Sequence, residues 1–272
     1  MAVNIHTNFT SLQAQRFLNV NASNQAKNVQ RLSSGFRINS AADDAAGLAI
    51  SEEMKSDIRS YGQAARNASD AVSMVQTAES SMQDVSNILG RLRELAMQGS
   101  SDGVNDTQRG YIDTEKTELL AEIDRIAGDT EYNGMSLLDG TLNATFQVGL
   151  DSGDTIAVTQ GTALSTAGMS INALDFTTRA GADAALAAID TAIEDVSGFR
   201  ASFGATSNRL DYIQNAISVQ SENLTAANGR IRDVDVASEM ASFTKNQILV
   251  QASTSMLAQA NAFPQTALSL LG

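Results

Sequence analysis

Apolar and small residues recur every three or four positions along much of this chain, with one step of seven. This heptad pattern is typical of helices that pack as coiled coils. At 1.5 Å per residue the first such helix would be roughly 70 to 80 Å long, so it needs packing partners along its whole length. The positions of this first seam are Ile50, Met54, Ile58, Tyr61, Ala65, Ala68, Val72, Val75, Met82, Val85, Leu89, Leu92 and Ala96.

Two further segments can supply these partners. A shorter apolar seam runs from Ile112 to Ile126, and a second long one runs from Leu186 to Ile231. The stretch QGSSDGVNDTQRG, residues 98–110, separates the first two segments and predicts a turn. We therefore expect three helices from distant parts of the sequence to share one core in an antiparallel rod.

The heptad pattern stops in residues 129–181, where Gly, Thr, Ser and Asn become frequent. Within this insert, the stretch ATFQVGLDSGDTIAVTQ alternates apolar and polar residues on both sides of the sequence DSGD. Such alternation around a turn predicts a β-hairpin.

Both ends of the chain carry helical stripes of apolar residues that find no partner within the predicted rod. We expect these two terminal helices to pair with each other and to contact copies of the chain in neighbouring molecules. The stripes consist of Leu18, Ala22, Val29, Leu32 and Phe36 at the N-terminus, and of Met240, Ile248, Leu249, Ala252, Met256 and Ala260 at the C-terminus.

The predicted fold is mainly α: a long antiparallel coiled-coil-like helical rod with paired terminal helices and a small insert that contains a β-hairpin. The terminal helices occupy residues 1–42 and 235–272. The rod takes residues 43–128 and 182–234, and the insert takes residues 129–181.

Charge is distributed unevenly along the chain. No acidic residue precedes Asp43 and no charged residue follows Lys245, so all 31 acids lie between these positions. Chain ends left in water usually carry charge, so we expect these ends to be covered. The net charge of −13, without a basic stripe, argues against a nucleic-acid partner. We find no cysteine, no apolar run long enough to span a membrane and no classical secretory signal.

Candidate chemistry is sparse. Asp43 and Asp44 could form a catalytic or metal-binding pair, but successive helical residues point about 100° apart and rarely converge on one substrate. His6 is the only histidine, and no cysteine is present to complete a zinc site or a catalytic set with it. We therefore expect no enzymatic activity, no cofactor and no metal site.

The two acids lie in the run LSSGFRINSAADDAAGLAIS, residues 32–51, which we interpret as a joint between two helices. Asn39 and Ser40 are candidates to cap the helix that follows, and an acid near its first turn would be favoured by the helix dipole. Gly35 and Gly47 would allow the chain to pass tightly between the helices.

Several segments together resemble bacterial flagellin. These are the joint sequence quoted above, the RELAMQ segment, EIDRIAGDTEYNG, FQVG, and a C-terminal NQILVQASTSMLAQAN that ends in LSLLG. The resemblance covers Met1 to about Gly149 and about Ala182 to Gly272, and the combination is specific. The region between them is variable in this family and is short here.

The resemblance implies a structural subunit that self-polymerises into the bacterial flagellar filament for swimming motility, with the paired terminal helices in the filament core. It also implies export through the flagellar secretion apparatus without a cleaved signal peptide. Expected partners are copies of itself, an export chaperone, the filament cap and hook–filament junction proteins. A flagellar hook–filament junction protein would share the terminal helices and is the alternative.

The resemblance also includes a surface patch that a host receptor recognises in other flagellins. In flagellins sensed by Toll-like receptor five, the receptor-facing patch resembles Arg91, Leu95 and Glu115 of this chain, although Gly90 replaces a polar residue common at its position. We expect this patch to face a neighbouring subunit in the filament, so that the free subunit would activate the receptor and the filament would not.

Overall fold

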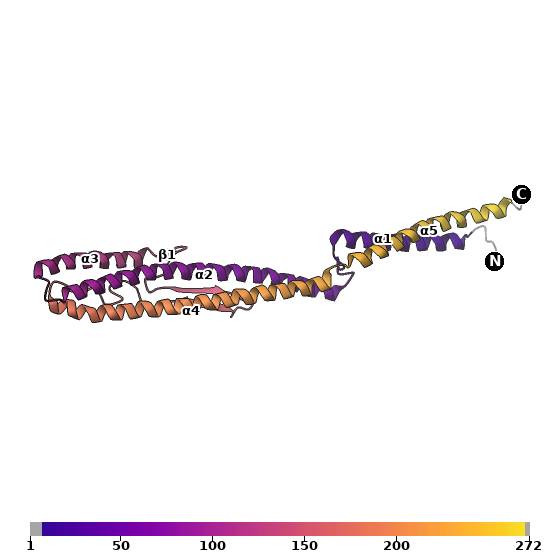
Figure 1. The fold of residues 1–272 in the computed structure, drawn as a ribbon. Coiled ribbons are helices and arrows are strands. Elements are labelled where there is room, and N and C mark those ends of the chain that lie inside the picture. The colour runs from indigo at the N-terminus through magenta and orange to yellow at the C-terminus, as the bar shows by residue number, and fades with distance from the viewer. Residues whose placement is uncertain (1–6, 270–272) are drawn as a thin grey trace. The chain divides into compact units, whose positions relative to one another are not determined.

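The computed structural model describes residues 7–269, with side chains described as far as residue 262. It is 73% helical, and the predicted fold class is confirmed. The helices of the described part are α1 (Phe9–Ser34), α2 (Ala45–Gly99), α3 (Asp106–Asp129), α4 (Arg179–Arg232) and α5 (Val236–Ser269) (Figure 1).

The chain forms two compact units. The first comprises Met1–Ile58 and Asn223–Gly272, and the second comprises Arg59–Glu222. The boundary between them falls inside α2 and α4, whereas the sequence-based division into terminal helices, rod and insert follows the joints between helices. That three-part division stays a prediction.

The core of the second unit lies between α2, α3 and α4, which run side by side (Figure 1). The buried residues of α2 and α4 recur mostly in steps of three, four or seven, as the heptad pattern predicts. Alanine fills many of these positions, so the helices can approach closely. The buried residues of α4 are Ala182, Ala185, Ile189, Ala192, Val196, Phe203, Leu210 and Ile217.

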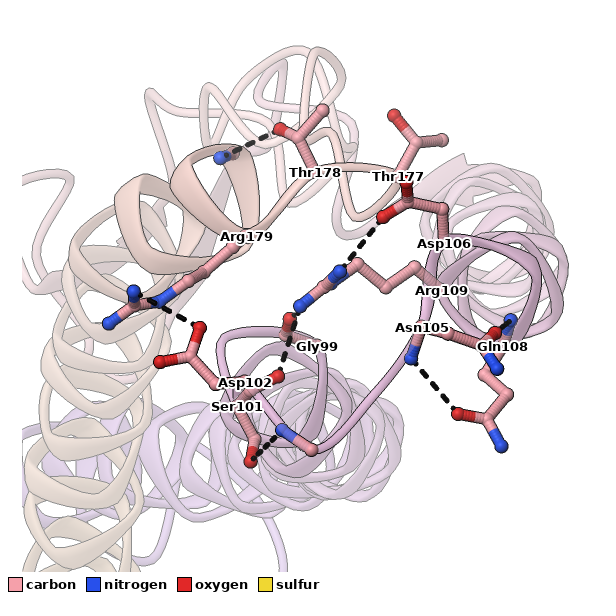
Figure 2. Close-up of polar contacts among 12 residues, drawn as sticks. Gly99, Ser101, Asp102, Asn105, Asp106, Gln108, Arg109, Thr177, Thr178 and Arg179 are labelled. Atoms are coloured by element: carbon pink, nitrogen blue, oxygen red, sulfur yellow. Dashed lines mark hydrogen bonds and ion pairs between the residues drawn. The ribbon is translucent and has the colours of Figure 1, made fainter.

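The connection between α2 and α3 is closed by a buried arginine (Figure 2). Arg109 is 7% exposed, and its guanidinium donates to the carbonyl oxygens of Gly99 at 2.9 Å and Ser101 at 3.0 Å. α3 itself begins with a capping box, in which Asn105 and Gln108 each accept a hydrogen bond from the other's backbone N–H. One side chain from the start of α3 therefore satisfies the last backbone carbonyl of α2 and also binds a carbonyl in the connection.

Two antiparallel hairpins follow α3. The first pairs β1 (Glu131–Tyr132) with β2 (Met135–Ser136), and the second pairs β3 (Asn143–Gln147) with β4 (Thr155–Thr159). In β4 the buried and exposed residues alternate, which directs Ile156 and Val158 into the core of the second unit. The predicted hairpin is confirmed; the shorter one was not predicted.

The rest of the insert is attached to α3 by two charged residues. The carboxylate of Asp124 accepts hydrogen bonds from the backbone N–H and the hydroxyl of Thr166, both at 2.8 Å. The ammonium of the buried Lys116 donates to the carbonyl oxygen of Leu174 at 2.8 Å and lies 5.8 Å from the ring centroid of Phe176. The insert therefore packs as part of the second unit, although it has little regular secondary structure.

Replacing Arg109 with Met should destabilise the second unit. The change leaves the buried carbonyl of Gly99 without the donor that Arg109 supplies and removes one of the two donors to the carbonyl of Ser101. An unsatisfied buried acceptor costs about 1–3 kcal/mol, so the free subunit should unfold at a lower temperature. Circular dichroism at increasing temperature measures this effect. Arg125→Met is the matched control on the same helix, because Arg125 is exposed and its ion pairs with Glu122 and Asp129 contribute at most about 1 kcal/mol. Equal melting temperatures for the two variants would contradict the role given to Arg109.

Candidate assembly surface

α1 and α5 pack along each other as an antiparallel pair in the first unit (Figure 1). The side-chain amide of Asn21 donates to the hydroxyl of Ser253 at 3.1 Å, and that of Asn246 donates to the side-chain oxygen of Asn28 at 2.9 Å. The least exposed positions, apart from Arg31 and Ala262, recur in steps of three and four on both helices. They are Ser11, Ala14, Leu18, Asn21, Gln25, Asn28 and Leu32 on α1, and Glu239, Phe243, Asn246, Val250, Ser253, Leu257 and Ala260 on α5.

This pair is unusual because much of its inner seam is polar while apolar side chains lie outside. Within α1 the only buried residue is Asn28. Large apolar side chains on the outer faces are left in water, which is rare over a wide area of a soluble monomer and marks a surface that another molecule covers. These exposed residues are Phe9, Leu12, Phe17, Val20 and Val29 on α1, and Val236, Met240, Ile248, Leu249 and Met256 on α5.

The predicted terminal stripes are divided between the seam and the outer faces. Leu18 and Leu32 lie half-buried on the seam. Val29 was expected in the same stripe but is exposed, since the stripe was traced through apolar residues whereas the seam itself passes through Asn21 and Asn28.

The C-terminal residues of the predicted stripe lie outside. Ile248 is 59% exposed, Met256 is 65% exposed and Leu249 is also exposed. No charged residue follows Lys245 in the sequence. Covering this face would therefore remove few charges from water, and the desolvation cost would be small.

The joint between α1 and α2 lies against the joint between α4 and α5. α1 ends at Ser34 and is capped by Gly35, which has φ 75° and donates its N–H to the carbonyl of Arg31. Beyond it, Arg37 N–H donates to the carbonyl of Arg232 at 2.6 Å, and Val234 N–H donates to that of Gly35 at 3.0 Å. The two joints thus form a short antiparallel bridge.

Arg232 links this bridge to the start of α2. Its guanidinium lies over the ring of Phe36, 4.7 Å from the centroid, and forms an ion pair with Glu52 at 2.6 Å. The same group lies 3.4 Å from the hydroxyl of the buried Ser51. The sequence gives no distinct signal for Arg232, because basic residues such as Arg230 and Arg232 are common in the last turn of a helix.

The carboxylates of Asp43 and Asp44 both accept hydrogen bonds within the joint. Asp43 accepts from the backbone N–H groups of Asn39 and Ser40 and from the Ser40 hydroxyl at 3.0 Å. The hydrogen bond from the Ser40 hydroxyl, with those from the two backbone groups and the charge of Arg31, lowers the pKa of Asp43 below its usual value. The two carboxylates accept from different donors, so they do not form a shared site.

Asp44 is the residue that caps α2, since its carboxylate accepts the N–H of Gly47 at 2.9 Å and its carbonyl accepts that of Leu48. The prediction that Asn39 or Ser40 caps this helix is wrong. Both residues lie too early in the chain, because α2 begins only at Ala45. Their backbone N–H groups donate instead to the carboxylate of Asp43.

Gly47 lies where a larger residue has no room. A Cβ atom there would come 2.8 Å from the Cδ1 of the buried Ile38 and 2.5 Å from the carboxylate oxygen of Asp44. The glycine therefore allows the cap and the apolar residue of the joint to pack against the first turn of α2.

In the second unit, the predicted receptor patch is only partly on the surface. Arg91 is 49% exposed and forms ion pairs with Glu115 at 2.8 Å and Glu94 at 3.0 Å. Hydrogen bonds from the guanidinium to these two acids raise the pKa of Arg91. Leu95 is 1% exposed, because it lies on the heptad seam beside Leu92, so its assignment to a surface patch is wrong in this structure.

Residues 7–269 contain no cluster of three or more His, Cys, Asp or Glu that could hold a metal ion. Within the same range no helix is long and apolar enough to cross a membrane. His6 lies outside the described residues.

Comparison with known proteins decides the family. Residues 5–143 match the model of the bacterial flagellin N-terminal helical region, and residues 186–271 match that of the C-terminal helical region. The chain belongs to the bacterial flagellin family. The flagellin of Bacillus subtilis is 42% identical over 301 aligned residues, which cover 98% of this chain and 99% of that protein.

Two further flagellin relatives agree. The flagellar filament 33 kDa core protein of Treponema phagedenis is 42% identical over 285 residues, with 98% of this chain and 99% of that protein covered. The crystal structure of Bacillus cereus flagellin has a TM-score of 0.52 at 36% identity, and covers 60% of this chain and 94% of its own. The expected family is thus confirmed.

Gly47→Ala should weaken the flagellin joint. The added methyl group displaces either Ile38 or the Asp44 cap, and overpacking of this kind costs about 1–3 kcal/mol, more than the gain of about 1 kcal/mol from replacing a helical glycine. Filaments of the variant should dissociate at a lower temperature than parental filaments, as followed by light scattering. Gly62→Ala is the control, because a Cβ atom there meets nothing within 4 Å, and should dissociate at the same or a higher temperature. If the Gly47 variant behaves like the control, the joint has more room than the structure indicates.

Proposed function

We propose that the outer apolar faces of α1 and α5 are the surfaces through which copies of this chain bind one another. The chain is a structural subunit of the bacterial flagellar filament, as its family membership indicates, and self-polymerisation is its function. The alternative of a hook–filament junction protein is not favoured, because relatives aligned over nearly the whole chain are named as flagellins and filament core proteins.

The observation that carries this proposal is the exposure of large apolar side chains on a pair whose own seam is largely polar. Burial of such side chains yields about 25 cal/mol per Å², and the assembled filament would supply the partner surface that one chain lacks. The same pair should be weakly held in the free subunit, since most helical stability in proteins comes from tertiary packing and the seam between α1 and α5 buries little apolar surface. We therefore expect α1 and α5 to be largely disordered before assembly.

Other parts of the function follow from family membership alone. We propose that the subunit has no enzymatic activity. We also propose that it leaves the cell through the flagellar secretion apparatus without cleavage of a signal peptide. An export chaperone, the filament cap and hook–filament junction proteins would be its partners along that route.

Replacing Ile248 and Met256 with Gln should hinder polymerisation. Both side chains point outward, so the pairing of α1 with α5 is left intact while apolar contacts with neighbours are lost. Full burial of such a side chain is worth about 1.5–3 kcal/mol, so the subunit concentration needed for polymerisation should rise about tenfold or more for each replaced residue. Sedimentation of filaments at increasing subunit concentration measures this critical concentration.

Thr254→Gln is the control, since it places the same side chain at an exposed polar position of α5. A chain that ends at Lys245 provides a second test: it should keep the helicity of the second unit and stay soluble, yet neither form filaments nor elongate seeds. Normal polymerisation of that shortened chain, or protection of α1 and α5 from hydrogen exchange in the free subunit, would contradict the mechanism.

We further propose that Arg91 and Glu115 take part in recognition by Toll-like receptor five, without Leu95. The exposed ion pair at 2.8 Å supports this proposal. Arg91→Ala should reduce receptor activation by free subunits by the loss of about 1–3 kcal/mol of binding energy. Arg93→Ala is the control: Arg93 is 47% exposed and is ion-paired to Asp190 at 2.6 Å. Unchanged dose–response curves for Arg91→Ala, measured in receptor-expressing cells, would remove this assignment.

A further inference from the structure

Asn28 is a buried amide in a helix pair that otherwise buries little. Its side-chain nitrogen donates to a carboxylate oxygen of Glu239 at 2.7 Å, and its side-chain oxygen accepts from the amide of Asn246 at 2.9 Å. The guanidinium of Arg31 lies 3.9 Å from the same carboxylate oxygen of Glu239. Both ends of the amide are therefore used, each by a different residue of α5, which fixes how the amide is oriented.

A second polar layer lies one heptad away on each helix. Asn21 precedes Asn28 by seven residues, and its amide donates to the hydroxyl of Ser253, which follows Asn246 by seven residues. Because the helices are antiparallel, both layers match at once in this arrangement. Residues between them on the seam, such as Gln25 and Val250, form the intervening layer.

We propose that Asn21 and Asn28 set the register in which α1 pairs with α5 during assembly. Polar residues at seam positions are known to specify register in coiled coils at a cost in stability. A slip of three or four residues would place Asn28 opposite Phe243 or Val250, where its amide would be buried without a partner. A slip of a full heptad would place Asn21 opposite Ala260, or Ser253 opposite Ala14, and would lose one of the two layers.

The apolar outer faces make such a device necessary. Apolar contacts are non-directional, so they do not distinguish one position along a helix from another. In the proposed assembly α1 would also lie against the outer apolar faces of other copies, and a slipped pair would bury nearly as much apolar surface as the correct one. The two polar layers penalise the slipped pairs, and specificity comes from that penalty.

The register can be read by disulfide cross-linking, because the chain has no cysteine of its own. One cysteine replaces Gln25, and a second replaces Gln247, Val250, Thr254 or Leu257 in four separate proteins. Two cysteines bridge only if their Cα atoms lie within about 7 Å, so the four proteins report different registers. Asn21, Asn28, Asn246 and Ser253 stay intact in all of them. Each protein is copolymerised as a minor fraction with the parental chain, and cross-links within one chain are separated from those between chains by gel mobility.

When Asn21 and Asn28 are unchanged, the yield of disulfide within one chain should be highest for the cysteine at position 250 and low for the other three. With Asn21→Leu and Asn28→Leu the maximum should be lost, and cross-links at 247, 254 or 257 should become comparable to that at 250. Asn19→Leu with Asn24→Leu is the matched control, since both residues are exposed on the same helix, and should keep the single maximum. Should the double variant stay out of the filament, Asn28→Leu alone is read in the same way.

A single maximum at 250 in the Asn→Leu background would overturn the inference. This inference rests on the proposed pairing of α1 and α5 in the filament, and the two can fail separately. If the proposed assembly surface is wrong, replacement of Ile248 and Met256 leaves polymerisation unchanged. If only the register device is wrong, filaments depend on those residues but the cross-linking profile does not depend on Asn21 and Asn28.

Discussion

The outer faces of α1 and α5 hold apolar side chains that the chain itself leaves in water. In the proposed assembly other copies cover them, because the seam between the two helices uses a different set of residues. The proposed surface accounts for the confinement of the acids to the middle of the sequence, between Asp43 and Lys245. A surface that must be dehydrated on assembly tolerates few charges, whereas the second unit can carry them on exposed faces of its helices.

The two helical seams of the protein serve different purposes. In the second unit, small and branched apolar residues such as Ala68, Val85 and Ile189 are fully buried, and the unit has a core of its own. In the α1–α5 pair, the polar Asn28 occupies the most buried position. The first seam supplies stability within a chain, whereas the second, under the proposed function, is a weak contact that depends on further copies.

Most of the helical fold could be predicted because heptad spacing reflects burial directly. Heptad spacing fails for the seam between α1 and α5. The predicted stripe follows apolar residues, but this seam passes through Asn21 and Asn28, which are polar. For Leu95 the two signals disagree: the family resemblance places it in a surface patch, whereas its spacing from Leu92 places it on the buried seam, where it lies.

Local details were the least predictable part. Both Ser40 and Asp44 are good capping residues, and only the start of α2 at Ala45 decides between them. The β1–β2 hairpin was predictable, because Asn-Gly is the usual pair in a two-residue hairpin turn. In the structure Asn133 and Gly134 form this turn, and both have positive φ. Arg232 gave no signal, since its role depends on two segments that are distant in sequence.

The way in which the insert is fixed has a practical consequence. The turn around Gly153 lies between two strands of defined register, and the segment after them is tied to α3 through Asp124 and Lys116. A Cβ atom at Gly153 would meet nothing within 4 Å. A foreign peptide introduced there would lengthen a loop whose ends are already held, and each doubling of loop length costs only about 0.6 kcal/mol. The chain is therefore a suitable scaffold for the display of an epitope in many copies along a polymer.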